Sequence, residues 1–226
     1  MSFELNSFND SNIINILCLG DSLTAGLVEN DLHEPYTTYL THLFKTQGLE
    51  HVVFVNAGVH QDTVEDIQSR LPALLEQHPF DFLILFGGIN DLGDIDMVPE
   101  SFTHDSPDDR VAHISFDAIY NQLMASPSLK SFLQLTIPYT AFDRLDPNEK
   151  NNKDALNRRI LLHPCPKKRV LDINSPHLSF NHLLATECER ALYWQDAIHY
   201  SVKGYQRLAE CIYTGLYPIL QEYVRF

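Results

Sequence analysis

The sequence predicts an α/β protein in which a parallel sheet of about five strands is covered by helices on both faces. Two observations support this fold class. Five short runs of residues are apolar almost without interruption, which is typical of strands that are buried on both faces. Segments with a helical spacing of apolar residues separate these runs, and regular alternation of strand and helix favours parallel strands joined by right-handed crossovers.

The pattern assigns each element to a stretch of the chain. Strands are expected at residues 14–19, 51–55, 81–86, 132–137 and 169–173. Helices are expected at residues 35–47, 63–78, 111–126, 148–162 and 202–223. Two further segments fit the alternation poorly: 93–110, which is acidic and contains two prolines, and 138–147. Each directly follows a strand, so we expect both to be long loops at the carboxyl edge of the sheet, where they could shape the substrate site.

Length and composition limit the possible functions. The chain has 226 residues, 44% of them hydrophobic, and no repeat or linker divides it, so a single domain over residues 1–226 is expected. Its 16 basic and 30 acidic residues give a net charge of −14, which argues against nucleic acid as a partner. No apolar run reaches the roughly 18 residues that suggest a membrane span, so no stable membrane insertion is expected.

The amino terminus and the cysteines predict a compartment. The first 12 residues lack the basic and apolar regions of a secretory signal, so a cytoplasmic location is expected. The four cysteines show no metal-type spacing, which favours reduced, structural thiols.

Ser22 stands at the end of the first expected strand, in the stretch "IINILCLGDSLTAG". Ligands of open α/β sheets bind at the carboxyl ends of strands, so Ser22 is a candidate nucleophile. Serine and aspartate are also ordinary helix caps, and Asp21 could bond the free N–H groups of a following helix. This stretch alone leaves both interpretations open.

Asp196 and His199, in "QDAIHYS", have a spacing that places both side chains on one face of a helical turn. The carboxylate could hold one imidazole nitrogen and leave the other as a base for a serine hydroxyl. A surface Asp–His pair is the alternative, since the chain has 11 histidines.

Two further stretches contain candidate hydrogen-bond donors. Asn90, in "FGGIND", could donate from its side-chain amide, and Gly58, in "NAGV", could offer a backbone N–H from a neighbouring loop. Donors that converge from separate loops suit a developing oxyanion. Asn, Asp and Gly are more often simple turn residues, so each stretch alone is weak.

The four stretches together resemble the SGNH/GDSL hydrolase family. "GDSLTAG", "NAGV", "GIND" and "DAIH" follow the order and approximate spacing of that family's four sequence blocks, over about residues 14–210. The resemblance implies a three-layer α/β/α sandwich with a flavodoxin-like sheet of strand order 2-1-3-4-5. It also implies that Ser22, His199 and Asp196 are nucleophile, base and orienting acid, and that Ser22, Gly58 and Asn90 form the oxyanion hole.

The chain differs from the family pattern at three positions: Ile89, Ala197 and Tyr200 stand beside the expected site residues. None of them removes a catalytic atom, and Ile89 is expected to narrow the acyl side of the cleft. Trp194, which precedes Asp196, could line the cleft or simply pack in the interior.

The predicted function is a serine esterase or acyl hydrolase that cleaves a small-molecule carboxylic ester or thioester through an acyl-enzyme, without metal or other cofactor. The nucleophile elbow G-x-S-x-G of α/β-hydrolases is absent, because Thr24 stands at its last glycine. The histidines show no zinc-ligand spacing. An acyltransferase or carbohydrate deacetylase with the same residues, or a binding protein on the same fold, stays an alternative, and the sequence leaves the oligomeric state open.

Overall fold

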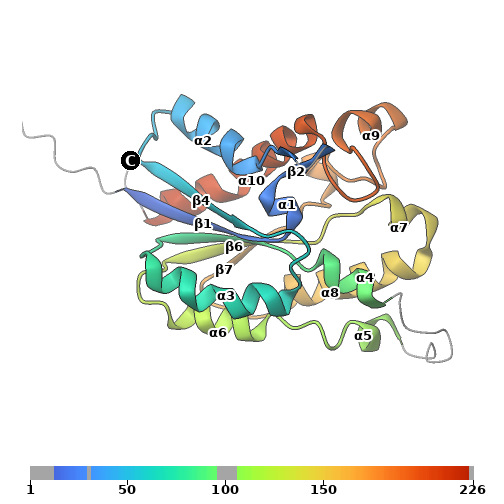
Figure 1. Cartoon of the computed structure of the whole chain (residues 1–226), viewed down its shortest axis with the longest axis horizontal. Coiled ribbons are helices and arrows are strands. Elements are labelled where there is room, and N and C mark those ends of the chain that lie inside the picture. Colours follow the sequence, from blue (N-terminus) through green and yellow to red (C-terminus); the bar gives the residue numbers. More distant parts are fainter. Residues whose placement is uncertain (1–12, 30–31, 96–105, 224–226) are drawn as a thin grey trace, which may run out of the picture.

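The computed structural model contains a five-stranded parallel sheet between two layers of helices (Figure 1). It describes residues 13–29, 32–95 and 106–223. The main sheet consists of β1 (Ile14–Gly20), β4 (Val52–Gly58), β5 (Phe82–Phe86), β6 (Ser131–Leu135) and β7 (Lys168–Leu171). The spatial order β4-β1-β5-β6-β7 confirms the predicted order 2-1-3-4-5.

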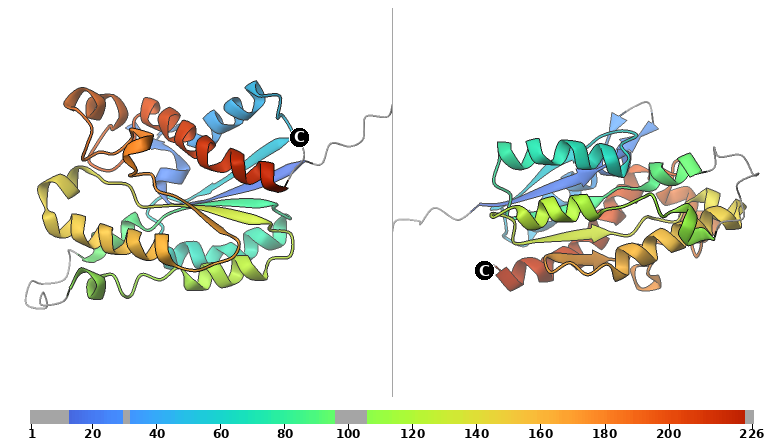
Figure 2. Two further views of the ribbon diagram at one scale, coloured as in Figure 1. Left: turned by 180° about the vertical axis from the view of Figure 1, so that it is seen from behind. Right: turned by 90° about the horizontal axis from the view of Figure 1, so that it is seen from below.

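The long helices cover both faces of this sheet, as the two views in Figure 2 show. One face carries α2 (Tyr36–Thr46) and α10 (Val202–Tyr223), and the other carries α3 (Val64–Gln77), α6 (Asp117–Ala125) and α8 (Pro147–Leu162). Because the central strands contact helices on both sides, they are buried throughout: every residue of β5 is buried, and Ile16 to Leu19 of β1 are fully inaccessible. This is the physical reason for their uninterrupted apolar sequence.

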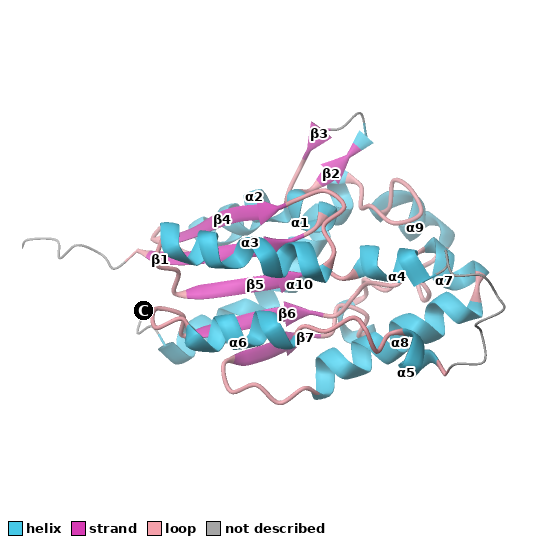
Figure 3. Cartoon of the chain, turned by 60° about the horizontal axis from the view of Figure 1, so that its bottom comes forward, coloured by secondary structure: helices cyan, strands magenta, loops and turns pink. Residues whose placement is uncertain are grey.

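Shorter elements gather at the carboxyl edge of the sheet (Figure 3). They are α1 (Ser22–Ala25), α4 (Ile89–Ile95), α5 (Pro107–Arg110), α7 (Ala141–Leu145), the single-turn helix η3 (Pro176–Leu178), α9 (Glu187–Tyr193) and the small hairpin β2 (Leu27–Val28) and β3 (Leu32–His33).

The chain between the strands differs from the expected course in three places. The segment 138–147 is largely helical, because Thr140 and Asp143 form a capping box that starts α7. The segment 93–110 begins inside α4 and ends in α5, while residues 96–105 lie outside the described residues. The helix expected from residue 111 begins only at Asp117. Val111, Ile114 and Phe116 are buried, but they lie in a turn and in irregular chain before the helix.

Candidate active site

Ser22, His199 and Asp196 lie in one hydrogen-bonded chain, although 177 residues separate the serine from the histidine. The Ser22 Oγ lies 3.1 Å from the His199 Nε2, and the His199 Nδ1 lies 2.8 Å from the Asp196 Oδ2. The structure therefore brings together the three side chains that the sequence singled out. An imidazole held in this way can take the hydroxyl proton on one side while the carboxylate fixes its other nitrogen.

The end of β1 and the start of α1 place Ser22. The Asp21 Oδ1 accepts a hydrogen bond from the Leu23 N–H at 2.9 Å, so Asp21 caps α1 and Ser22 becomes the first residue of that helix. A backbone N–H at this position has no partner within its own helix and stays available to a ligand. Gly26, at φ 81°, ends α1 after a single turn.

Asp21 itself is an unusual group, because it is 1% exposed next to the candidate nucleophile. Burial raises the pKa of its carboxyl to about 7, and the charges of Asp91 and Asp62 act in the same direction, while the bond from Leu23 opposes them. Its Oδ2 has no hydrogen-bond partner among the described residues. The expectation that Asp21 serves as a cap is confirmed.

A short closed loop positions Asp196 and His199. Trp194 and Tyr200 form an antiparallel bridge, and the Gln195 N–H donates to the His199 oxygen at 3.1 Å. Inside the loop, the Asp196 Oδ1 accepts from the Ile198 N–H at 2.7 Å and from the His199 N–H at 2.6 Å. Partial burial raises the pKa of Asp196, but these bonds and His199 outweigh it and hold the pKa below the usual value.

Asn90 lies in the first turn of α4, directly after β5, and its amide Nδ2 donates to the main-chain oxygen of Asp62 at 2.9 Å. The Asp62 Oδ2 in turn lies 2.6 Å from the Arg70 Nε, and the Arg70 Nη2 donates to the Gly20 oxygen at 2.8 Å. Arg70 therefore joins the loop before α3 to the end of β1. The sequence analysis missed Asp62 and Arg70, because a single arginine on a helix forms no motif.

The expectation that Gly58 offers a free N–H was wrong. The Gly58 N–H already donates to the Asn56 Oδ1 at 2.9 Å, and the Asn56 Nδ2 donates to the Thr24 oxygen at 2.7 Å. A Cβ atom at residue 58 would lie 2.1 Å from the Ala25 nitrogen, so a glycine is required where β4 passes under α1. The "NAGV" stretch fastens α1 to β4, and an oxyanion role for Gly58 stays a prediction.

The turn after Gly58 brings His60 to the site. In this turn the Asp62 N–H donates to the Val59 oxygen at 3.3 Å, and Gln61 has a φ of 65°, which few residues other than glycine adopt. His60, in the same turn, lies beside the candidate base, with its ring centroid 6.4 Å from that of His199. Strained backbone of this kind is often found at functional sites.

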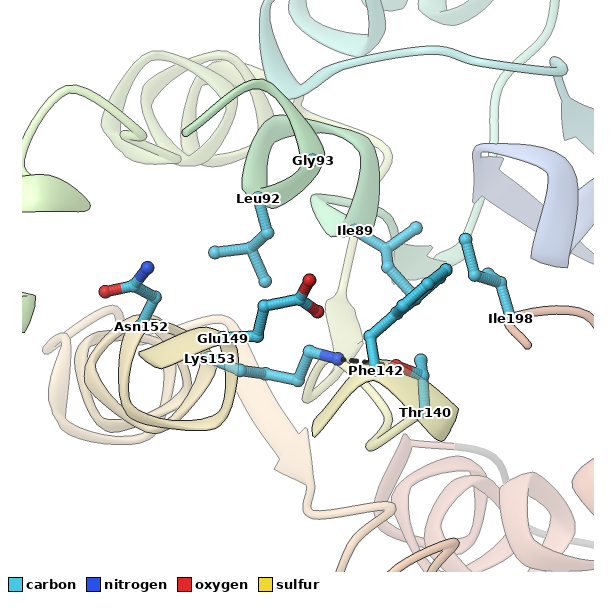
Figure 4. A pocket seen from close by; sticks show the side chains of 9 residues that line it. All are labelled: Ile89, Leu92, Gly93, Thr140, Phe142, Glu149, Asn152, Lys153 and Ile198. Carbon is cyan, nitrogen blue, oxygen red and sulfur yellow. Dashed lines mark hydrogen bonds between the residues drawn. The ribbon is translucent and has the colours of Figure 1, made fainter. Parts of the chain in front are cut away.

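A cavity of about 230 Å³ opens beside this constellation (Figure 4). Its walls come from α4, from α7 and the residue before it, from α8 and from the loop that carries His199. The lining residues are Ile89, Leu92, Gly93, Thr140, Phe142, Glu149, Asn152, Lys153 and Ile198. The Lys153 Nζ lies 2.5 Å from the Asp143 Oδ2 and 3.4 Å from the Thr140 Oγ1, in a nearly inaccessible ion pair. Burial lowers the pKa of Lys153, and the charge of Asp143 opposes that shift.

The residues that differ from the family pattern also have structural explanations. Ile89 lines the cavity, as expected for a residue that narrows the cleft. The Ala197 oxygen accepts a hydrogen bond from the Ala141 N–H at 3.0 Å, which attaches α7 to the loop of His199. Tyr200 and Trp194 are buried and pack on Phe180, with ring centroids 5.1 Å and 5.3 Å away, so Trp194 packs and does not form the cleft wall.

Within residues 13–29, 32–95 and 106–223, no group of three or more His, Cys, Asp or Glu side chains could hold a metal ion. No helix in these same ranges is both long and apolar enough to cross a bilayer. All four cysteines are free thiols.

The fold and the site define a class: a hydrolase with a Ser–His–Asp arrangement at the carboxyl edge of a flavodoxin-like sheet. The model of the GDSL-like Lipase/Acylhydrolase family matches residues 18–207, and the chain belongs to this family. No curated protein matches the sequence.

Solved structures share this fold at low sequence identity. An acetyl xylan esterase from Geobacillus stearothermophilus, solved as a variant, is 21% identical with a TM-score of 0.64, covering 90% of this chain and 94% of its own. A lipase/acylhydrolase from Enterococcus faecalis is 21% identical with a TM-score of 0.62, covering 91% of this chain and 96% of its own. An enzyme from the metagenome of Lake Arreo, Spain, described as an alpha/beta hydrolase, is 22% identical with a TM-score of 0.62, covering 89% and 94%.

Proposed function

We propose that the protein hydrolyses carboxylic esters or thioesters of small molecules through an acyl-enzyme formed at Ser22. The observation that carries the proposal is the hydrogen-bonded chain from the Ser22 Oγ through both His199 nitrogens to the Asp196 carboxylate, at 3.1 and 2.8 Å. A serine hydroxyl is a weak nucleophile until a base accepts its proton, and the His199 Nε2 is within reach to do so.

The reaction follows from these positions. The Ser22 Oγ attacks the ester carbonyl while its proton passes to the His199 Nε2, and a C–O bond forms as the carbonyl becomes an oxyanion. The backbone N–H of Ser22 and the second N–H of the Asn90 amide are proposed to stabilise that oxyanion, whereas the Gly58 N–H is already engaged by Asn56. The intermediate then collapses: the bond to the alcohol or thiol breaks, and the leaving group takes the proton from His199. Water, deprotonated by His199, attacks the acyl-enzyme. The bond to the Ser22 Oγ breaks, Ser22 regains its proton from His199, and the carboxylic acid is released.

Covalent labelling tests this proposal directly. A serine-directed fluorophosphonate should add once per molecule, at Ser22, with loss of p-nitrophenyl acetate hydrolysis in proportion to labelling. Ser22→Ala should be neither labelled nor active, while Ser69→Ala, at an exposed serine on α3, should behave as the wild type. A label on another serine, or equal labelling of Ser22→Ala, would refute the assignment.

A further inference from the structure

The cavity adjoins the proposed site through two of its lining residues. Ile89 directly precedes Asn90, and Ile198 directly precedes His199, so two lining residues are the chain neighbours of proposed site residues. At about 230 Å³ the cavity is smaller than the roughly 300–1,000 Å³ of most ligand pockets. Its size therefore suits a small group and not a long chain.

The lining changes character with distance from His199. Figure 4 shows Ile89, Phe142 and Ile198 together toward one side of the cavity, and Glu149 and Asn152 toward the other. Glu149, Asn152 and Lys153 have the i, i+3, i+4 spacing of α8, so one face of that helix supplies all the charged and amide groups. The charged and amide groups thus gather toward the side of the cavity away from Ile198, where Leu92 also lies, while Thr140 lies on the side of Ile198.

Covering the Asn152 and Glu149 side of the cavity with an alkyl chain is energetically unfavourable. Asn152 is 2% exposed, and its Oδ1 has no hydrogen-bond partner among the described residues. The Lys153 ammonium is already held by Asp143 and Thr140. A methylene chain that reached this side would leave the buried Asn152 Oδ1 without a partner and would remove water from the Glu149 carboxylate without offering a hydrogen bond. A hydroxyl group can both donate and accept, so it suits an amide beside a carboxylate.

We propose that this cavity receives the acyl group of the ester, and that Glu149 and Asn152 restrict it to short acyl chains and favour a hydroxyl over a methyl group at their far end. This inference rests on the proposed function, because it places the ester carbonyl at Ser22. It makes Asn152 and Glu149 specificity-determining residues that take no part in the chemistry.

A series of p-nitrophenyl esters with one leaving group tests the proposal: acetate, butyrate, 3-hydroxypropionate and octanoate. The 3-hydroxypropionyl group is a butyryl group whose terminal methyl is replaced by a hydroxyl. For the wild type, kcat/KM should be about tenfold higher for 3-hydroxypropionate than for butyrate, and octanoate should be the poorest substrate. Asn152→Leu replaces the amide with an apolar group of the same branching, so the ratio of 3-hydroxypropionate to butyrate should fall about tenfold. The matched control is Asn151→Leu, at an exposed position on the same helix, which should keep the wild-type ratio.

The outcomes separate this proposal from the proposed function. If Asn152→Leu does not fold, Glu149→Met tests the same point, and it should lower the same ratio. Ser22-dependent hydrolysis of the acetate with unchanged ratios in the folded variants would overturn the acyl pocket alone. A changed preference only among acetate esters of different alcohols would also overturn it, because the cavity would then hold the alcohol. Absence of Ser22-dependent acetate hydrolysis would refute the proposed function and this inference together.

Discussion

The Asn90 amide donates to the main-chain oxygen of Asp62 at 2.9 Å, so the start of α4 is tied to the loop before α3. The bond uses one of the two amide hydrogens and fixes where the other points. Asn90 therefore has both a structural contact and a proposed role in oxyanion binding, and the two make different predictions.

Asn90→Ala should lower kcat about 100- to 1,000-fold with KM nearly unchanged, because an oxyanion donor acts mainly in the transition state. The lost hydrogen bond should also reduce the free energy of unfolding by about 1 kcal/mol. Asn181→Ala is the control, since the Asn181 amide likewise donates to a main-chain oxygen, that of Asn174 at 2.6 Å. It should lose stability and keep its kcat. An Asn90→Ala protein that is destabilised but fully active would contradict the oxyanion role.

Asp196→Asn should reduce kcat by as much as about 10⁴-fold, because an amide N–H facing the His199 Nδ1 would hold the imidazole in the wrong tautomer. The hydrogen bonds that lower the Asp196 pKa keep the wild-type carboxylate ionised at neutral and mildly acidic pH. Protonation of Asp196 should therefore not limit activity at mildly acidic pH, and His199→Gln should abolish nearly all activity. Asp66→Asn, at the capping box of α3, is the control and should stay active. Wild-type kcat in Asp196→Asn would exclude the orienting role.

Gly58→Ala should lower the free energy of unfolding by about 1–3 kcal/mol, because the added Cβ would lie 2.1 Å from the Ala25 nitrogen and push α1 away from β4. Alanine retains the backbone N–H, so this loss reports packing alone. Gly93→Ala adds the same methyl group in α4 where no atom lies within 4 Å, and its helix should gain up to about 1 kcal/mol. Chemical denaturation of both variants measures the difference. Equal stabilities would show that β4 and α1 are not closely packed.

Asp21→Asn should weaken the dependence of stability on pH. The folded-state pKa of Asp21 is about 7 against an ordinary 3.8, so between these values the folded protein keeps a proton that the unfolded chain has lost. Stability contributed by this group is therefore lost as pH rises from about 4 to about 7. The drop in the free energy of unfolding from pH 5 to pH 8 should be about 1–3 kcal/mol smaller in the variant. Glu189→Gln, a carboxyl whose pKa is lowered, should leave that drop unchanged. The same drop in Asp21→Asn as in wild type would show that Asp21 ionises normally.

The sheet was predictable because each central strand is buried on both faces, and only a continuous apolar run satisfies that requirement. Helices that pack on the sheet were predictable for a related reason, and the bounds of α10 agree with the predicted residues 202–223. The short elements at the carboxyl edge were not predictable from the sequence, because a helix of one turn is too short to show a periodic spacing of apolar residues. A capping signal, such as Thr140 followed by Asp143, could have revealed α7.

The residues of the candidate site also differ in how far the sequence could predict their roles. Ser22, Asp196 and His199 stand at element ends in recognisable stretches, so the sequence could single them out before their proximity was known. The sequence was also compatible with a donor role for Gly58, because a glycine in a loop can offer a backbone N–H, form a turn or allow close packing. Only the positions of Asn56 and Ala25 show that this one permits close packing.

One main-chain hydrogen bond joins the wall of the cavity to the loop that carries His199. The Ala141 N–H, at the start of α7, donates to the Ala197 oxygen, two residues before His199. Phe142, the next residue along, forms part of the cavity wall. A substitution that enlarges the cavity by shifting α7 would therefore also displace the imidazole, and turnover would fall as the range of accepted substrates widened. A redesign of the cavity should therefore alter Glu149 or Asn152 of α8 and keep Lys153, whose ammonium is bonded to Asp143 of α7.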